Sequence, residues 1–186
     1  MSPLTVWLIG YAAPAIFAGT VLKVLPRHRR KLNARNAIII HGALILSILV
    51  SQYCIRSRGF VFPWHLDVLS VGAYLLSIVL ATVMVGRLGF LYGLSALVQQ
   101  LAMLSMTFLL LPAYPFYVVV ALIVPIYAYC HVLKAHHWLL REELFLVWGA
   151  VSIWVFSVFP DVFLIVAVHA FLGAALISML FLYPRN

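Results

Sequence analysis

Residues 162–182 read VFLIVAVHAFLGAALISMLFL, a run of 21 residues without a charged side chain. About 20 apolar residues in a helix, at about 1.5 Å of rise each, cross the roughly 30 Å hydrocarbon core of a bilayer. The whole chain of 186 residues has this character, because 66% of it is hydrophobic and 9% is charged. Ordinary soluble domains have about 45–50% apolar and 25% charged residues. The composition therefore predicts a membrane protein without a soluble domain.

Six further apolar segments precede this one, so we expect an all-α polytopic bundle of about seven transmembrane helices. The expected spans are 6–25, 37–55, 66–85, 88–111, 116–133, 144–159 and 162–182. The segment 144–159 is the shortest and ends in Phe159-Pro160-Asp161, so six spans are the alternative. Pro14 and Pro125 lie inside spans and predict kinks there. Residues 1–186 are expected to form a single transmembrane helical domain.

Positive charge predicts the orientation of the bundle, because lysine and arginine collect in cytoplasmic loops. With seven spans and the N-terminus outside, ten of the 12 Lys and Arg residues lie on the cytoplasmic side. Only Arg56 and Arg58 lie outside. The sequence therefore predicts an outside N-terminus and a cytoplasmic C-terminus, in the cytoplasmic (inner) membrane.

One short loop, PRHRRKLNAR at 26–35, carries much of the net charge of +8. Basic residues at a membrane surface attract anionic headgroups by about 1 kcal/mol each. We therefore expect anionic phospholipid as a partner of this loop. The loop lacks interleaved aromatic residues and an accompanying nucleic-acid-binding fold, so nucleic acid is not an expected partner. The residues expected to contact lipid are Arg27, Arg29, Arg30, Lys31 and Arg35.

Polar side chains near the middle of a span are the default indicators of function in a bundle of this kind. Gln99 and Gln100 lie near the middle of the fourth span, with Ser95 one turn before Gln99. Adjacent helical residues point about 100° apart, so both amides avoid lipid only where the helix has neighbours on two sides. Interhelical hydrogen bonding is one interpretation. The lining of a pore, or contact with a quinone, carotenoid or prenyl chain, is the other.

The last span combines a histidine with small residues. His169 and Gly173 share one face at a spacing of four, and Ala170 and Ala174 lie beside them. Small residues let a second helix approach closely in a membrane. This face therefore predicts a helix contact across which His169 forms a hydrogen bond.

Two histidines could hold a cofactor. His41 in the second span and His131 in the fifth are both close to the cytoplasmic side, and two imidazoles at one depth are what bis-histidine haem requires. Ordinary interfacial histidines are the alternative interpretation. The identity of any cofactor stays open at this point, and no metal-ion site is predicted.

The densest polar stretch is CHVLKAHHWLLREEL at 130–144. Glu142 and Glu143, followed by Leu144-Phe145, resemble the start of the EExxxR motif of the CPBP intramembrane proteases, and His169 stands about where their FxxxH histidine follows. Val147 replaces the arginine of that motif. The resemblance implies a glutamate that activates water and a histidine that polarises the scissile carbonyl. The candidate catalytic residues are Glu142, Glu143, His136 and His169.

Three function classes follow from these patterns. The first is a non-catalytic membrane subunit or scaffold that packs against a larger membrane protein complex, as the aromatic content, small-residue faces and short loops favour. The second is an intramembrane enzyme that acts on lipid, isoprenoid or peptide at the cytoplasmic interface. The third is a small-molecule transporter or channel lined by Ser95, Gln99 and Gln100.

Overall fold

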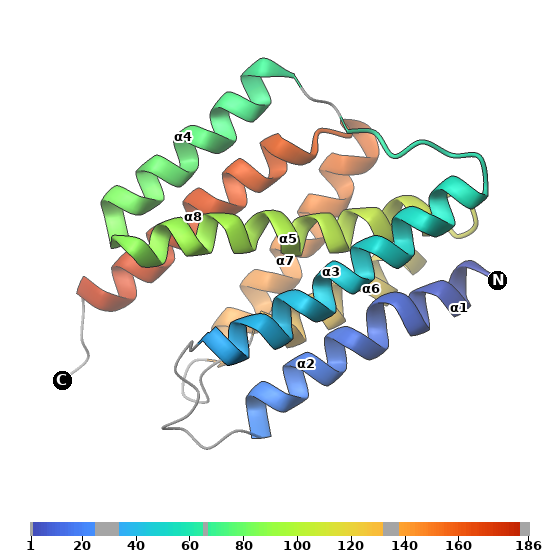
Figure 1. Ribbon diagram of the computed structural model, residues 1–186, viewed down its shortest axis with the longest axis horizontal. Coiled ribbons are helices and arrows are strands. Elements are labelled where there is room, and N and C mark those ends of the chain that lie inside the picture. The colour runs from blue at the N-terminus through green and yellow to red at the C-terminus, as the bar shows by residue number, and fades with distance from the viewer. Residues whose placement is uncertain (1, 25–33, 65–66, 132–137, 183–186) are drawn as a thin grey trace. The chain divides into compact units, whose positions relative to one another are not determined.

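The computed structural model describes residues 2–24, 34–64, 67–131 and 138–182, and its regular structure within these ranges is helical throughout (Figure 1). The helices are α1 (Pro3–Trp7), the π-helix η1 (Leu8–Ala12), α2 (Ala13–Val24), α3 (Ala34–Ser57), α4 (Val68–Val85), α5 (Arg87–Leu110), α6 (Phe116–His131), α7 (Trp138–Val158) and α8 (Val162–Leu182). Since α1, η1 and α2 are continuous, they form one helical segment, and the described chain has seven such segments.

Three helical stretches in the described chain are long and apolar enough to cross a membrane, namely Pro3–Thr20, Val68–Val85 and Arg87–Leu110. Six of the seven helical segments agree with the expected spans to within three residues at each end. The exception is α7, which begins at Trp138 instead of residue 144. The hydropathy falls at Arg141, Glu142 and Glu143, but arginine and glutamate are good helix formers, so the helix continues through them. The helix α7 therefore begins six residues before the apolar span that the sequence predicts at 144–159.

Pro14 is accommodated by a wider turn of the first helix. Proline has no N–H, and its ring crowds the carbonyl four residues earlier, here that of Gly10. The backbone is π-helical immediately before it, and Ala13 N donates to Leu8 O, five residues back. A π turn relieves the crowding while the helix continues. Ser2 begins this helix as its N-cap, since its Oγ accepts from Thr5 N at 3.1 Å.

The described helices form two compact units. The first unit lies within Met1–Phe62 and Ala102–Trp154, and the second within Pro63–Leu101 and Val155–Asn186. The chain of α5 passes from the second unit into the first, and that of α7 passes from the first into the second.

In the first unit, α2 lies beside α3 and α6 (Figure 1). Glycines allow the close approach: a Cβ on Gly10 would lie 2.7 Å from Val50 Cγ1, and one on Gly19 would lie 2.8 Å from Tyr129 Cε1. Tyr129 also shares a hydrogen bond of 3.0 Å with Thr20. Small residues at such contacts let helices pack backbone against side chain, as membrane helices commonly do.

The second unit consists of α4, α8, the first part of α5 and the last turn of α7. Helices α4 and α8 lie side by side along most of their length (Figure 1). Gly86, with φ +63°, ends α4 and reverses the chain directly into α5. A Cβ on Gly89 would lie 1.9 Å from Ala81 O, so the backbones of α4 and α5 touch at this point. The hairpin of α4 and α5 therefore determines which side of α5 faces the other helices of the second unit.

Candidate polar site of the second unit

Asp161 joins two helices at the start of α8. Its Oδ1 accepts from Leu164 N at 2.9 Å, which caps the helix, and its Oδ2 accepts a hydrogen bond from Ser70 Oγ of α4. Both side chains are buried. A carboxylate at a helix N-terminus is stabilised by the unsatisfied N–H groups and by the helix dipole. The same carboxylate thus begins α8 and attaches α4 to it.

The buried face of α4 is partly polar. Ser70, Tyr74 and Ser77 are all buried and recur at helical spacing. Tyr74 Oη donates to Gly93 O of α5 at 3.1 Å, and its ring lies 6.0 Å from that of Phe163 in α8. Tyr74 therefore contacts both neighbouring helices of its unit.

His169 and Gln100 form a buried pair between α8 and α5. Gln100 Nε2 lies 2.8 Å from His169 Nδ1, and both side chains are at most 3% exposed. With the amide in this orientation, its NH₂ group faces Nδ1 of the imidazole. This bond lies inside the second unit and joins α5 to α8.

Tyr92 of α5 fills the space beside this pair. Its ring stands edge-on to the imidazole of His169, with centroids 5.9 Å apart. A Cβ on Gly173 would lie 2.1 Å from Tyr92 Oη, so only a glycine at this position leaves room for the tyrosine. The face of α8 that carries His169 and Gly173 thus contacts two side chains of α5, Gln100 and Tyr92.

Gln99 has a different arrangement from Gln100. Its Nε2 donates to Ser95 Oγ at 2.8 Å within α5, and the side chain is half-buried. Sequence reasoning expected neighbours on two sides of the helix to keep both amides from lipid, and it did not include this bond along the same helix. The predicted trio of Ser95, Gln99 and Gln100 therefore divides into an intrahelical pair and one interhelical partner of His169.

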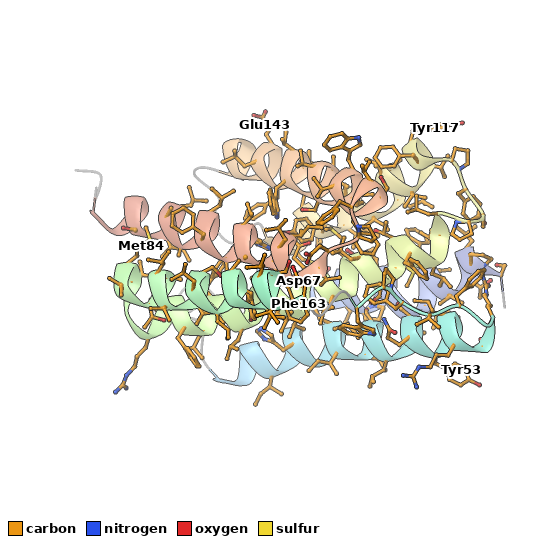
Figure 2. All side chains as sticks on the ribbon, turned by 90° about the horizontal axis from the view of Figure 1, so that it is seen from above. Tyr53, Asp67, Met84, Tyr117, Glu143 and Phe163 are labelled. Carbon is orange, nitrogen blue, oxygen red and sulfur yellow. The ribbon has the colours of Figure 1, made fainter. Side chains whose placement is uncertain are left out.

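The other predicted residues lie elsewhere. His41 is half-buried in α3 of the first unit, and Glu143 is exposed in α7, where its carboxylate points outward (Figure 2). The side chains of Arg35, His131 and Glu142 lie outside the described part of the structure, as do Arg27, Arg29, Arg30, Lys31 and His136. The predictions of a haem-binding pair, of catalytic glutamates and of a lipid-contacting loop therefore stay predictions. Within the described ranges, no three His, Cys, Asp or Glu side chains form a group that could hold a metal ion.

Sequence reasoning missed several residues of this site, among them Asp161, Ser70 and Tyr92. Asp161 directly precedes the apolar run of α8, and an acidic residue in that position is a recognisable N-cap signal. Ser70 and Tyr92 carry no comparable signal, because single serines and tyrosines are common in membrane helices.

The chain matches no known protein family, and searches of curated proteins and of solved structures found no match either.

Proposed function

We propose that this chain is a multi-pass protein of the cytoplasmic (inner) membrane that acts without catalysis, as a subunit or scaffold packed against a larger membrane protein complex. The distribution of side chains on α4 supports the membrane setting. Its buried face includes Ser70, Tyr74 and Ser77, whereas its most exposed side chains, Val68, Leu69 and Val83, are 79–83% exposed and aliphatic. Soluble proteins bury aliphatic residues and expose polar ones, so a bilayer is the fitting solvent for this helix.

The use of the buried polar groups supports a structural role. Asp161 bonds Ser70 and caps α8, His169 bonds Gln100, and Gln99 bonds Ser95. The bonds of Asp161 and His169 run between helices, and interhelical hydrogen bonds hold membrane helices together, whereas the bond of Gln99 lies within α5. These side chains are therefore engaged in helix packing, which favours assembly over chemistry.

Gly72 is the observation that carries the proposal of a partner. It lies exposed on α4 among large aliphatic residues, and a Cβ placed on it would meet nothing within 4 Å. Glycine lowers helix stability by about 1 kcal/mol relative to alanine, and small residues on the outer face of a membrane helix are typical of contacts with another helix. We therefore assign the Gly72 face of α4 to a helix of the partner complex.

The test is native purification of the chromosomally tagged protein in mild detergent, with mass spectrometry of the co-migrating species. We expect stoichiometric co-migration with a larger membrane complex. Gly72→Leu places a large side chain on the proposed contact face and should abolish co-migration, whereas Val83→Leu enlarges an exposed side chain of the same helix and should retain it. Migration of the wild-type protein alone would overturn the proposal and direct attention to Glu143 and the enzyme alternative.

A further inference from the structure

A proline interrupts the backbone hydrogen bonds of α6. Pro125 lies inside this helix and has no N–H, so the carbonyl oxygen of Ala121, four residues earlier, loses its helical donor. The carbonyl of a helical residue points along the axis toward the nitrogen four residues later. Ala121 and Pro125 are both exposed, so the freed oxygen lies on the outer face of the helix.

Pro14 in the first helix is accommodated differently. The turn before Pro14 is π-helical, and Gly10, whose carbonyl faces this proline, is buried. Helix α6 is an α-helix from Phe116 to His131 and contains no such turn. The wider turn that relieves the first proline therefore does not serve Ala121.

The sequence of α6 supplies no replacement donor. Membrane helices tolerate proline because hydroxyl side chains, water or neighbouring helices satisfy the freed carbonyl. Residues 116–131 contain no serine or threonine. Ala121 lies within the apolar stretch Phe116–Cys130, and in the proposed membrane setting water is scarce at that level. A neighbouring helix is then the remaining source of a donor.

Two sides of α6 are occupied within the first unit. Tyr129 shares a hydrogen bond with Thr20 of α2. Val124 and Tyr127 lie against Gly149 of α7, where an added Cβ would be 3.2–3.4 Å from them. These contacts hold α6 in its unit and leave a third side exposed.

The exposed side of α6 carries Tyr117, Ala121 and Pro125, which recur every four residues and therefore share one face. Tyr117 is 72% exposed and points away from the helix (Figure 2). Ala121 is the small residue in the middle, and small residues let a second helix approach closely. Close approach at this alanine brings a side chain of the second helix within reach of the freed oxygen.

We propose that the face of α6 formed by Tyr117, Ala121 and Pro125 binds a transmembrane helix of the partner complex, and that a hydroxyl, amide or indole group of that helix donates to Ala121 O. This inference rests on the proposed function, because it adds a second contact with the same complex. The freed carbonyl carries the assignment, since it requires a donor that neither an acyl chain nor an aliphatic helix provides.

The first test restores the missing N–H. Pro125→Ala lets Ala121 O bond within α6, so the affinity for the complex, measured on native gels over a dilution series, should fall about 3- to 30-fold, the value of one interhelical hydrogen bond. The isolated variant should unfold at a higher temperature, because alanine replaces a proline in a helix interior. Pro14→Ala is the matched control and should bind the complex like the wild type, since the carbonyl that it affects belongs to the buried Gly10.

A second variant keeps both the proline and the freed carbonyl. Ala121→Leu retains Pro125 but blocks close approach of another helix, so it should weaken association at least as much as Pro125→Ala. Val151→Leu enlarges an exposed side chain of α7 and should associate like the wild type. This pair of variants tests the face even if Pro125→Ala changes the shape of α6.

Photo-crosslinking identifies what lies on this face. Tyr117 is replaced by benzoylphenylalanine in the full chain, the native membranes are irradiated, and the cross-linked peptide is sequenced by mass spectrometry. We expect a transmembrane segment of another protein with a Ser, Thr, Asn, Gln or Trp residue within about one helical turn of the cross-link. Cross-links to phospholipid alone, or to a second copy of this chain, would overturn the proposal.

The outcomes separate this inference from the proposed function. A folded Pro125→Ala variant that binds the complex within twofold of wild type would overturn the donor contact and leave the subunit role intact. Migration of the wild-type protein alone would overturn the subunit role, and this contact with it.

Discussion

Gln100 of α5 and His169 of α8 hydrogen-bond to each other across 69 positions of sequence, with 2.8 Å between Nε2 and Nδ1. Both side chains are buried, and the bond connects the middle of α8 to α5. Its energetic value is the first quantity to measure in this protein.

A double-mutant cycle should show coupling between these two residues. Interhelical hydrogen bonds in membrane proteins contribute about 0.5–2 kcal/mol, so His169→Ala and Gln100→Ala should each lower the free energy of unfolding, and their effects should not add. His169→Asn places an oxygen acceptor near the position of Nδ1 and should retain most of the stability. Thermal unfolding in mild detergent measures the wild type, the two alanine variants, their combination and His169→Asn. Additive effects of the two alanine substitutions would show that the bond contributes nothing.

Gly173→Ala should destabilise the second unit, because the added Cβ would meet Tyr92 Oη at 2.1 Å. Overpacking of this kind costs about 1–3 kcal/mol. The matched control is Gly72→Ala, whose Cβ meets nothing within 4 Å and which should be neutral or stabilise the isolated protein by up to about 1 kcal/mol. Tyr92→Ala should remove most of the penalty of Gly173→Ala. Equal melting temperatures for Gly173→Ala and Gly72→Ala would contradict the close contact.

Two neighbouring glycines of α5 should differ in their tolerance of alanine. A Cβ on Gly89 would lie 1.9 Å from the backbone oxygen of Ala81, whereas one on Gly93 would lie 2.8 Å from a side-chain atom of Ile78. A side chain can change rotamer, but the backbone of a helix cannot move without losing its hydrogen bonds. Gly89→Ala should therefore cost about 3 kcal/mol or more, and Gly93→Ala should cost less. Comparison of the two unfolding midpoints in one detergent tests this order.

Asp161 should be replaceable by asparagine but not by alanine. Asparagine is an equally good N-cap, and its side chain can still bond Ser70, so Asp161→Asn should change stability by less than about 1 kcal/mol. Asp161→Ala removes the cap of α8 and leaves the buried Ser70 hydroxyl without its acceptor, which should cost about 2–4 kcal/mol. Ser70→Ala should have a smaller effect, since the cap remains. A loss with asparagine as large as that with alanine would show that the negative charge itself is required.

The positions of the helices could be predicted from the sequence because each one depends on local properties. Long apolar runs interrupted by Gly86 or by Phe159-Pro160-Asp161 define where helices begin and end. The start of α7 was the exception, because charged residues end a hydrophobic run without ending a helix. The π turn before Pro14 could not be predicted from hydropathy either. It arises because the proline ring crowds the carbonyl of Gly10, and hydropathy does not describe such a steric conflict.

The sequence alone therefore determined the helical class, six of the seven segments and the candidates Gln100 and His169. Only the tertiary structure decided that these two residues meet, that Gln99 bonds Ser95 instead, and that Asp161, Ser70 and Tyr92 belong to the same unit. The physical reason is that a helix satisfies its backbone within a few residues, whereas side chains meet across helices only at the register that packing selects. Contacts such as that of Tyr92 with Gly173 set the register of α5 against α8. The hydrophobic periodicity of a single helix does not specify which residues of another helix it will meet.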